Sequence, residues 1–227
     1  RMSPRPLLLA ALLLAACGEK SAAPPPPPSP PPEAPEAAVP ALDEFGPFEG
    51  RVNDIAFWIH PSVPFNSMAI AATDAGLVAL NIEDGKEVAR IEGLRAGAAE
   101  VIYEDVYSLT DSDGYKARGI LLARDEDRKS LRFFEIHNAT RTLTELDGAF
   151  DAGDIDAWCS GPQFLGPTRL VTIGGGKMRT YDVEFGKNSA SVVPTTLEGQ
   201  YERESRVRAR GCVIGKQEGE LFVLYET

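Results

Sequence analysis

The chain is poor in the residues on which most metal, redox and nucleophilic sites are built. Its 227 residues include 3 cysteines and 2 histidines, and no two cysteines are spaced as Cys-x-x-Cys. Zinc sites and dithiol redox motifs need such clusters. A serine hydrolase of the α/β type needs a Gly-x-Ser-x-Gly motif, which the sequence lacks. The composition therefore argues against all three classes of site.

Positive charge is also scarce. The chain has 23 Lys and Arg residues against 34 Asp and Glu residues, which gives a net charge of -11. Nucleic-acid binding depends on clustered cations, so no nucleic-acid partner is expected. An acidic protein can instead bind cations.

The N-terminal residues have the order of a bacterial export signal. Arg1 and Arg5 precede an uncharged apolar run over Leu7–Ala16. This run is too short to span a bilayer and is typical of a signal peptide. It ends in Leu-Ala-Ala-Cys, which resembles the bacterial lipobox. The sequence therefore predicts a lipoprotein signal peptide over residues 1–16 and lipid attachment at Cys17; the alternative is a hydrophobic anchor with an incidental cysteine.

Proline is concentrated in the segment that follows. Residues 21–40 are almost entirely Pro, Ala, Ser and Glu, with five consecutive prolines at 24–28. Proline fixes φ and donates no backbone hydrogen bond, so residues 17–45 are predicted to form an extended linker; a proline motif bound by a partner is the alternative. We expect an exported, membrane-anchored lipoprotein, periplasmic or at the cell surface, with one domain over 46–227.

Export also bears on the two remaining cysteines, Cys159 and Cys212. An oxidising compartment would permit a disulfide between them. They belong to no Cys-x-x-Cys motif or Cys/His cluster, and two separate buried thiols are the favoured expectation.

The globular part has the pattern of an all-β domain. Short runs rich in Val, Ile, Leu, Tyr and Phe alternate with turn residues, and no long amphipathic helix is evident. Four runs begin at intervals of 51 residues: Met68–Thr73, Gly119–Arg124, Leu170–Gly175 and Leu221–Glu226. Further strands follow within each unit, and four strands per unit of this length are typical of a β-propeller blade. An irregular β-sandwich is the alternative.

Three segments resemble the β-propeller phytases, which are secreted, calcium-dependent phosphatases with six blades. Residues 53–61, Asn-Asp-Ile-Ala-Phe-Trp-Ile-His-Pro, are similar to the opening blade of the family. Residues 122–136 and 210–223 resemble two later blades. The resemblance implies about three and a half four-stranded blades of six, in an incomplete chain. It also implies calcium-assisted release of phosphate from phosphate monoesters, phytate first, as in a 3-phytase.

The resemblance implies roles for individual residues. Asp54 and Glu226 correspond to calcium ligands, and Arg124 to a guanidinium that binds the phosphate and stabilises the transferring charge. Glu100 can keep the charge of a third metal-binding carboxylate, and Lys177 lies close to a substrate-binding lysine of the family. Positions 124 and 226 recur in the repeat, so we expect both at one rim. The structural alternatives are a turn aspartate, a surface arginine and a rim carboxylate.

Several positions depart from the family pattern. They are Asp74-Ala75 in place of lysines, Ala96–Ala99 in place of amides, Gly161 and Gly174 in place of a tyrosine and a lysine, and Arg210 in place of a glutamate. A carboxylate at position 74 would repel phosphate, and an arginine at 210 reverses the charge of a metal ligand. These departures favour a second hypothesis, a catalytically impaired propeller that serves as a lipid-anchored binding or auxiliary domain. The phosphatase is the leading prediction.

Overall fold

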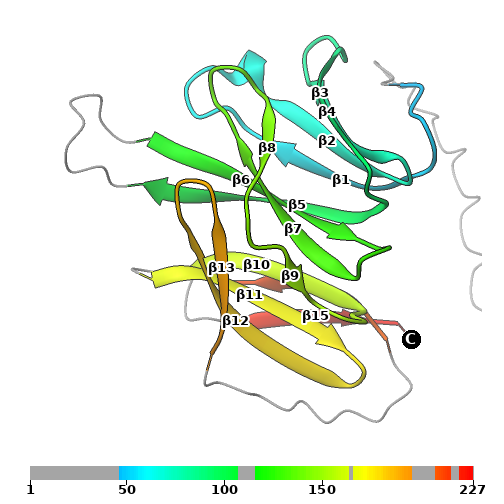
Figure 1. Ribbon diagram of the computed structural model, residues 1–227, viewed down its shortest axis with the longest axis vertical. Helices are drawn as coiled ribbons and strands as arrows, with labels where there is room; N and C mark the ends of the chain where they lie inside the picture. Colours follow the sequence, from blue (N-terminus) through cyan, green and yellow to red (C-terminus); the bar gives the residue numbers. More distant parts are fainter. Residues whose placement is uncertain (1–45, 107–115, 164–165, 196–207, 216–219, 227) are drawn as a thin grey trace, which may run out of the picture. The chain divides into compact units, whose positions relative to one another are not determined.

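The computed structural model describes residues 46–106, 116–163, 166–195, 208–215 and 220–226 (Figure 1). Within these residues the chain is all-β, with fifteen strands in four antiparallel sheets and one short 3-10 helix, Pro64–Asn66. None of the helical structure there is long and apolar enough to cross a membrane. The predicted signal peptide, Cys17 and the linker lie outside the described residues.

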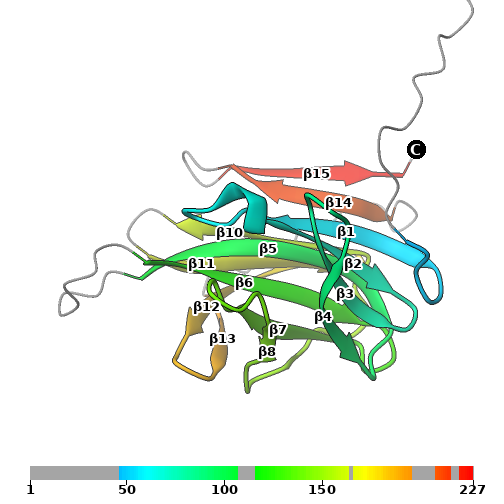
Figure 2. The same cartoon turned by 90° about the horizontal axis from the view of Figure 1, so that it is seen from above.

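The first three sheets are meanders of consecutive strands. Sheet 1 contains β1 (Val52–Trp58), β2 (Met68–Thr73), β3 (Gly76–Asn81) and β4 (Glu87–Glu92). Sheet 2 contains β5 (Ala96–Val106), β6 (Lys116–Asp125), β7 (Ser130–Ile136) and β8 (Leu143–Glu145), and β9 (Phe150–Asp151) pairs with β7. Sheet 3 contains β10 (Ala157–Gln163), β11 (Gly166–Gly174), β12 (Lys177–Phe185) and β13 (Ala190–Pro194). Sheet 4 contains β14 (Ala209–Ile214), orange in Figure 2, and β15 (Leu221–Tyr225), which is red.

The predicted all-β class is confirmed, and the four runs spaced by 51 residues correspond to β2, β6, β11 and β15, the second strand of each sheet. The turns follow local chemistry. Asp74 and Ala75 connect β2 to β3, and Gly76 after them has φ of +141°, where a Cβ would lie 2.0 Å from the Ile91 carbonyl oxygen. Glycine is therefore required there. The described sheets form no closed barrel or propeller.

Three apolar clusters join successive sheets. Because alternate residues of a strand point to opposite faces, adjacent residues of sheet 2 enter different clusters. Phe134 packs with Trp58 of sheet 1, whereas Phe133 packs with Leu170 of sheet 3. The third cluster joins sheet 3 to sheet 4 through residues such as Val171. Sheets 2 and 3 are thus covered on both faces, and the first strands β1, β5, β10 and β14 are neighbours in that order.

A disulfide joins sheets 3 and 4. Cys159 on β10 and Cys212 on β14 are bonded, with their Cα atoms 5.5 Å apart. The expectation of two separate thiols is wrong, because nothing in the sequence indicates how sheet 3 packs on sheet 4. The two residues are 53 positions apart, yet the packing of β10 beside β14 brings them within the range of a disulfide.

Candidate functional site

A pocket of about 540 Å³ lies at one end of the sheets. Antiparallel pairing places the start of each first strand beside the end of each second strand, as in Ala96 opposite Asp125 and Ala157 opposite Ile173. Side chains from all four sheets therefore meet at this end. The wall includes Asn53, Asp54, Ala99, Glu100, Arg124, Glu126, Asp156, Trp158, Cys159, Arg210 and Cys212.

Two carboxylates in the wall tie neighbouring sheets together. A bulge in β1 precedes Asp54, whose Oδ1 accepts a hydrogen bond from the Ile55 amide at 2.9 Å. Its Oδ2 accepts one from the Ala99 amide of β5 at 3.0 Å. Glu100, also on β5, accepts a hydrogen bond through Oε2 from the Ser160 amide of β10 at 3.0 Å. Both side chains are fixed by backbone donors, and each oxygen retains a lone pair for another ligand.

The environment of Glu100 favours its neutral form. The pKa of Glu100 is raised from 4.5 to about 7, chiefly by burial and to a smaller extent by the negative charge of Asp54, while hydrogen bonding with Ser160 opposes the shift. A buried carboxylate beside another carboxylate gains from any cation that approaches both. The carboxylates of Asp54 and Glu100 are therefore suited to bind a cation. Without a cation, ionisation of Glu100 beside Asp54 costs free energy.

Arg124 is the buried cation of this wall, with 5% of its surface exposed. Its Nη2 donates to the Gly153 carbonyl oxygen at 2.6 Å, and its Nε lies 4.0 Å from Oε2 of Glu126. Its Nη1 is buried and has no hydrogen-bond partner among the described residues. Burial lowers the pKa of Arg124, and nearby carboxylates, first Glu126 and then Asp154, oppose that shift.

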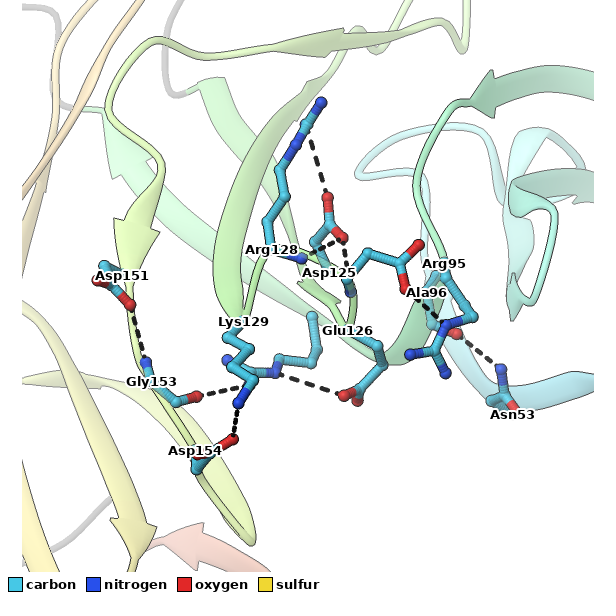
Figure 3. A network of polar contacts seen from close by, with 12 residues as sticks. Asn53, Arg95, Ala96, Asp125, Glu126, Arg128, Lys129, Asp151, Gly153 and Asp154 are labelled. Atoms are coloured by element: carbon cyan, nitrogen blue, oxygen red, sulfur yellow. Dashed lines mark hydrogen bonds and ion pairs between the residues drawn. The ribbon is translucent and has the colours of Figure 1, made fainter.

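The turn that follows Arg124 is held by a polar network (Figure 3). Asp125 is 1% exposed, and its Oδ1 accepts hydrogen bonds from the backbone amides of Asp127 and Arg128, both at 3.2 Å. Its Oδ2 lies 3.4 Å from Nη1 of Arg132. These contacts fix the end of β6, so they position both Arg124 and Glu126 in the pocket wall.

Asp74 is a neighbour of the pocket residue Asn53. It is exposed and lies outside the pocket wall, where its Oδ1 accepts a hydrogen bond at 2.9 Å from Nδ2 of Asn53. Asn53 also donates to the Ala96 carbonyl oxygen of β5 at 2.8 Å (Figure 3). Asp74 therefore orients a residue of the pocket and does not face a ligand in it.

The structure brings together three of the predicted residues and leaves two outside. Asp54, Glu100 and Arg124 line the same pocket, whereas Glu226 and Lys177 do not. Glu226 follows β15 and forms an ion pair with Arg210, which does line the pocket. Lys177 is exposed at the start of β12.

Three polar pocket residues were missed by the sequence arguments: Asn53, Glu126 and Asp156. Asn53 belongs to the opening motif, and Glu126 lies two positions after Arg124, so both could have been found. Asp156 had no signal, because the distance between first and second strands varies among the sheets and the 51-residue repeat does not extend to the first strands.

The fit of a calcium ion to these residues is partial. Asp54 and Glu100 offer carboxylate oxygens, but the described residues contain no group of three Asp, Glu, His or Cys side chains close enough to hold a metal. Calcium takes six to eight oxygen ligands, so the pair would need oxygens from a substrate or from water as well.

No protein-family model matches the chain, and no curated protein is significantly similar to it. The resemblance to β-propeller phytases stays a prediction that depends on the motifs themselves.

Proposed function

We propose that this chain is part of a β-propeller and acts as a calcium-assisted phosphomonoesterase, with phytate as its first substrate. The observation that supports the proposal is the convergence of Asp54, Glu100 and Arg124 in one pocket from two sheets. The sequence predicted Asp54 and Glu100 as calcium ligands and Arg124 as a phosphate-binding residue. The three residues line one pocket although they lie up to 70 positions apart in the sequence. The order of the first strands, β1, β5, β10 and β14, agrees with successive propeller blades.

Each pocket residue has a distinct part in this proposal. Asp54 and Glu100 would hold calcium, which when bound supplies positive charge to the phosphoryl oxygens and acidifies a bound water. Arg124 lines the pocket and is fixed by Gly153, and its guanidinium would donate to a phosphate oxygen. A donor fixed in advance stabilises the charge that develops on a transferring phosphoryl group.

The proposed setting follows from the N-terminal residues. Lipid on Cys17 and a stiff linker would hold the domain at a membrane, in the periplasm or at the cell surface. There it would release phosphate from phosphate monoesters outside the cytoplasm, where calcium is available.

The test is phosphate release from phytate by the full chain carrying Cys17→Ser, with calcium and with a chelator. We expect release that depends on calcium, and a loss of about a hundredfold or more in Asp54→Asn. Asp84→Asn, in the turn between β3 and β4, is the matched control and should keep full activity. Equal rates with calcium and with chelator, or no release at all, would contradict the proposal.

A second candidate function is favoured by Arg210. Arg210 lines the pocket and its guanidinium pairs with Glu226, so a predicted metal ligand is engaged with a cation. On this hypothesis the domain binds an anionic ligand without hydrolysing it. Titration calorimetry with phytate would then give saturable binding that weakens in Arg210→Gln, with no phosphate released.

A further inference from the structure

The disulfide between sheets 3 and 4 also lies in the wall of the pocket. Cys159 and Cys212 both line the pocket, and so do their neighbours Trp158 and Gly211. Cys159 is 3% exposed and belongs to the apolar cluster between the two sheets, and Cys212 packs against that cluster while partly exposed. A covalent bond between β10 and β14 therefore holds this wall where a ligand would lie.

The bond completes a path across the wall from sheet 2 to sheet 4. Glu100 on β5 accepts a hydrogen bond from the Ser160 amide of β10, and Ser160 is the residue after Cys159. Cys159 is bonded to Cys212, which lies two residues after Arg210 on β14. A carboxylate and a guanidinium of the pocket, contributed by different sheets, are thus connected through the disulfide.

Strand pairing alone does not fix Arg210. The residues on either side of it pair across β15 with Tyr225 and Leu224, whereas Arg210 is the bulged residue and has no partner in the register of the described strands. A bulge turns a side chain out of the regular alternation. The side chain of Arg210 is 60% exposed, as is much of its ion-pair partner Glu226, and an exposed ion pair restrains a side chain weakly. The bond at Cys212 is therefore the strong constraint on the backbone near Arg210.

We propose that the Cys159–Cys212 disulfide is a positioning link that holds Arg210 in the pocket wall, ready to bind a phosphate group of the ligand. A guanidinium that is positioned before binding loses less conformational freedom when the ligand arrives. Cutting the bond should therefore weaken anion binding in a domain that stays folded on its apolar clusters. The proposal rests on the proposed binding of a phosphate monoester in the pocket, whether or not hydrolysis follows.

The test compares phytate binding with and without the bond, by titration calorimetry at a fixed calcium concentration. The parent is the full chain carrying Cys17→Ser, and excess dithiothreitol supplies the two electrons and two protons that convert the S–S bond to two thiols, while the dithiol closes to its own disulfide. We expect reduction to weaken binding by about threefold or more, and Arg210→Gln to weaken it by about tenfold. The double variant Cys159→Ser, Cys212→Ser should bind like the reduced parent in the absence of dithiothreitol.

The effect of reduction should depend on Arg210. In the Arg210→Gln chain, reduction should weaken binding no further, because the link then has no guanidinium to position. An equal loss on reduction with and without Arg210 would overturn the proposal, and so would no loss in either chain.

Val171→Ala is the matched control for stability. Val171 on β11 is 3% exposed in the cluster between sheets 3 and 4 and does not line the pocket. Its truncation should destabilise the contact between these sheets while the disulfide stays in place. At a temperature where circular dichroism shows both chains folded, Val171→Ala should bind phytate as the parent does. A loss of affinity as large as that caused by reduction would show a general effect of stability and contradict the proposal.

Hydrogen exchange measured by mass spectrometry separates failure of this proposal from failure of the proposed function. Reduction should speed exchange in Ala209–Ile214 by about tenfold or more, beyond any effect of Val171→Ala, and should leave Met68–Thr73 of sheet 1 unchanged. A parent that binds no phytate would contradict the proposed function, and exchange in β14 would still decide whether the disulfide holds this strand. Unchanged exchange in β14 after reduction would overturn the positioning link.

Discussion

The partly buried carboxyl of Glu100 predicts a pH dependence of folding stability. Burial first, and then the charge of Asp54, raises the pKa of Glu100 from 4.5 to about 7 in the folded chain. The folded state therefore binds the proton more tightly than the unfolded state. Protonation of Glu100 therefore stabilises the folded state. This stabilisation is fully present below about pH 4.5 and is lost as the pH rises through about 7. Glu100→Gln, which cannot ionise, should not show this loss.

The magnitude follows from the two pKa values. At about 1.4 kcal/mol for each tenfold change in proton affinity, the difference between 4.5 and about 7 corresponds to about 3 kcal/mol. At about pH 8 we therefore expect Glu100→Gln to unfold with a free energy higher than the parent by as much as about 3 kcal/mol. At about pH 4.5 the two proteins should differ by less than about 1 kcal/mol, because protonated Glu and Gln are similar in shape.

Urea unfolding at both pH values, followed by circular dichroism and with calcium removed, measures the difference. Glu83→Gln, in the exposed turn after β3, is the control for loss of a negative charge at the surface. An equal effect of Glu100→Gln at the two pH values would refute the reasoning. If calcium binds Asp54 and Glu100, adding it at high pH should reduce the difference in free energy of unfolding between Glu100→Gln and the parent, because calcium stabilises the ionised Glu100 of the parent.

Three further predictions concern stability. Reduction of the Cys159–Cys212 disulfide, which closes a loop of 53 residues, should lower the free energy of unfolding by about 4 kcal/mol in the chain-entropy account, measured in urea with and without reductant. Asp125→Ala should cost about 3 kcal/mol or more because it removes buried turn and Arg132 contacts, and Asp125→Asn should cost less in the same assay. Gly76→Ala should lower Tm, because its Cβ would meet a carbonyl oxygen at 2.0 Å.

The sequence predicted the strands more fully than their packing. Alternating apolar runs and turn residues identified β2, β6, β11 and β15, because strand formation and hairpins depend on neighbours in the chain. The repeat placed Arg124 and Glu226 at equivalent strand ends, but only Arg124 lines the pocket, and the place of Asp54 beside it came from the family resemblance alone. The disulfide was not predictable, since it depends on how sheet 3 packs on sheet 4. Lys177 was expected near the substrate, but the turn before β12 leaves it on the surface outside the pocket.

Asp74 and Arg210 both depart from the phytase pattern, and the residues that each side chain contacts explain its role better than its charge alone. Asp74 lies outside the pocket and accepts a hydrogen bond from Asn53. Its carboxylate therefore helps to position Asn53, the residue before Asp54. Arg210 faces the pocket, and its charge is balanced by Glu226. Of these two substitutions, Arg210 is therefore the one that bears directly on the pocket. If a cation binds at Asp54, Arg210→Gln should strengthen that binding, whereas Asp74→Asn should change it little.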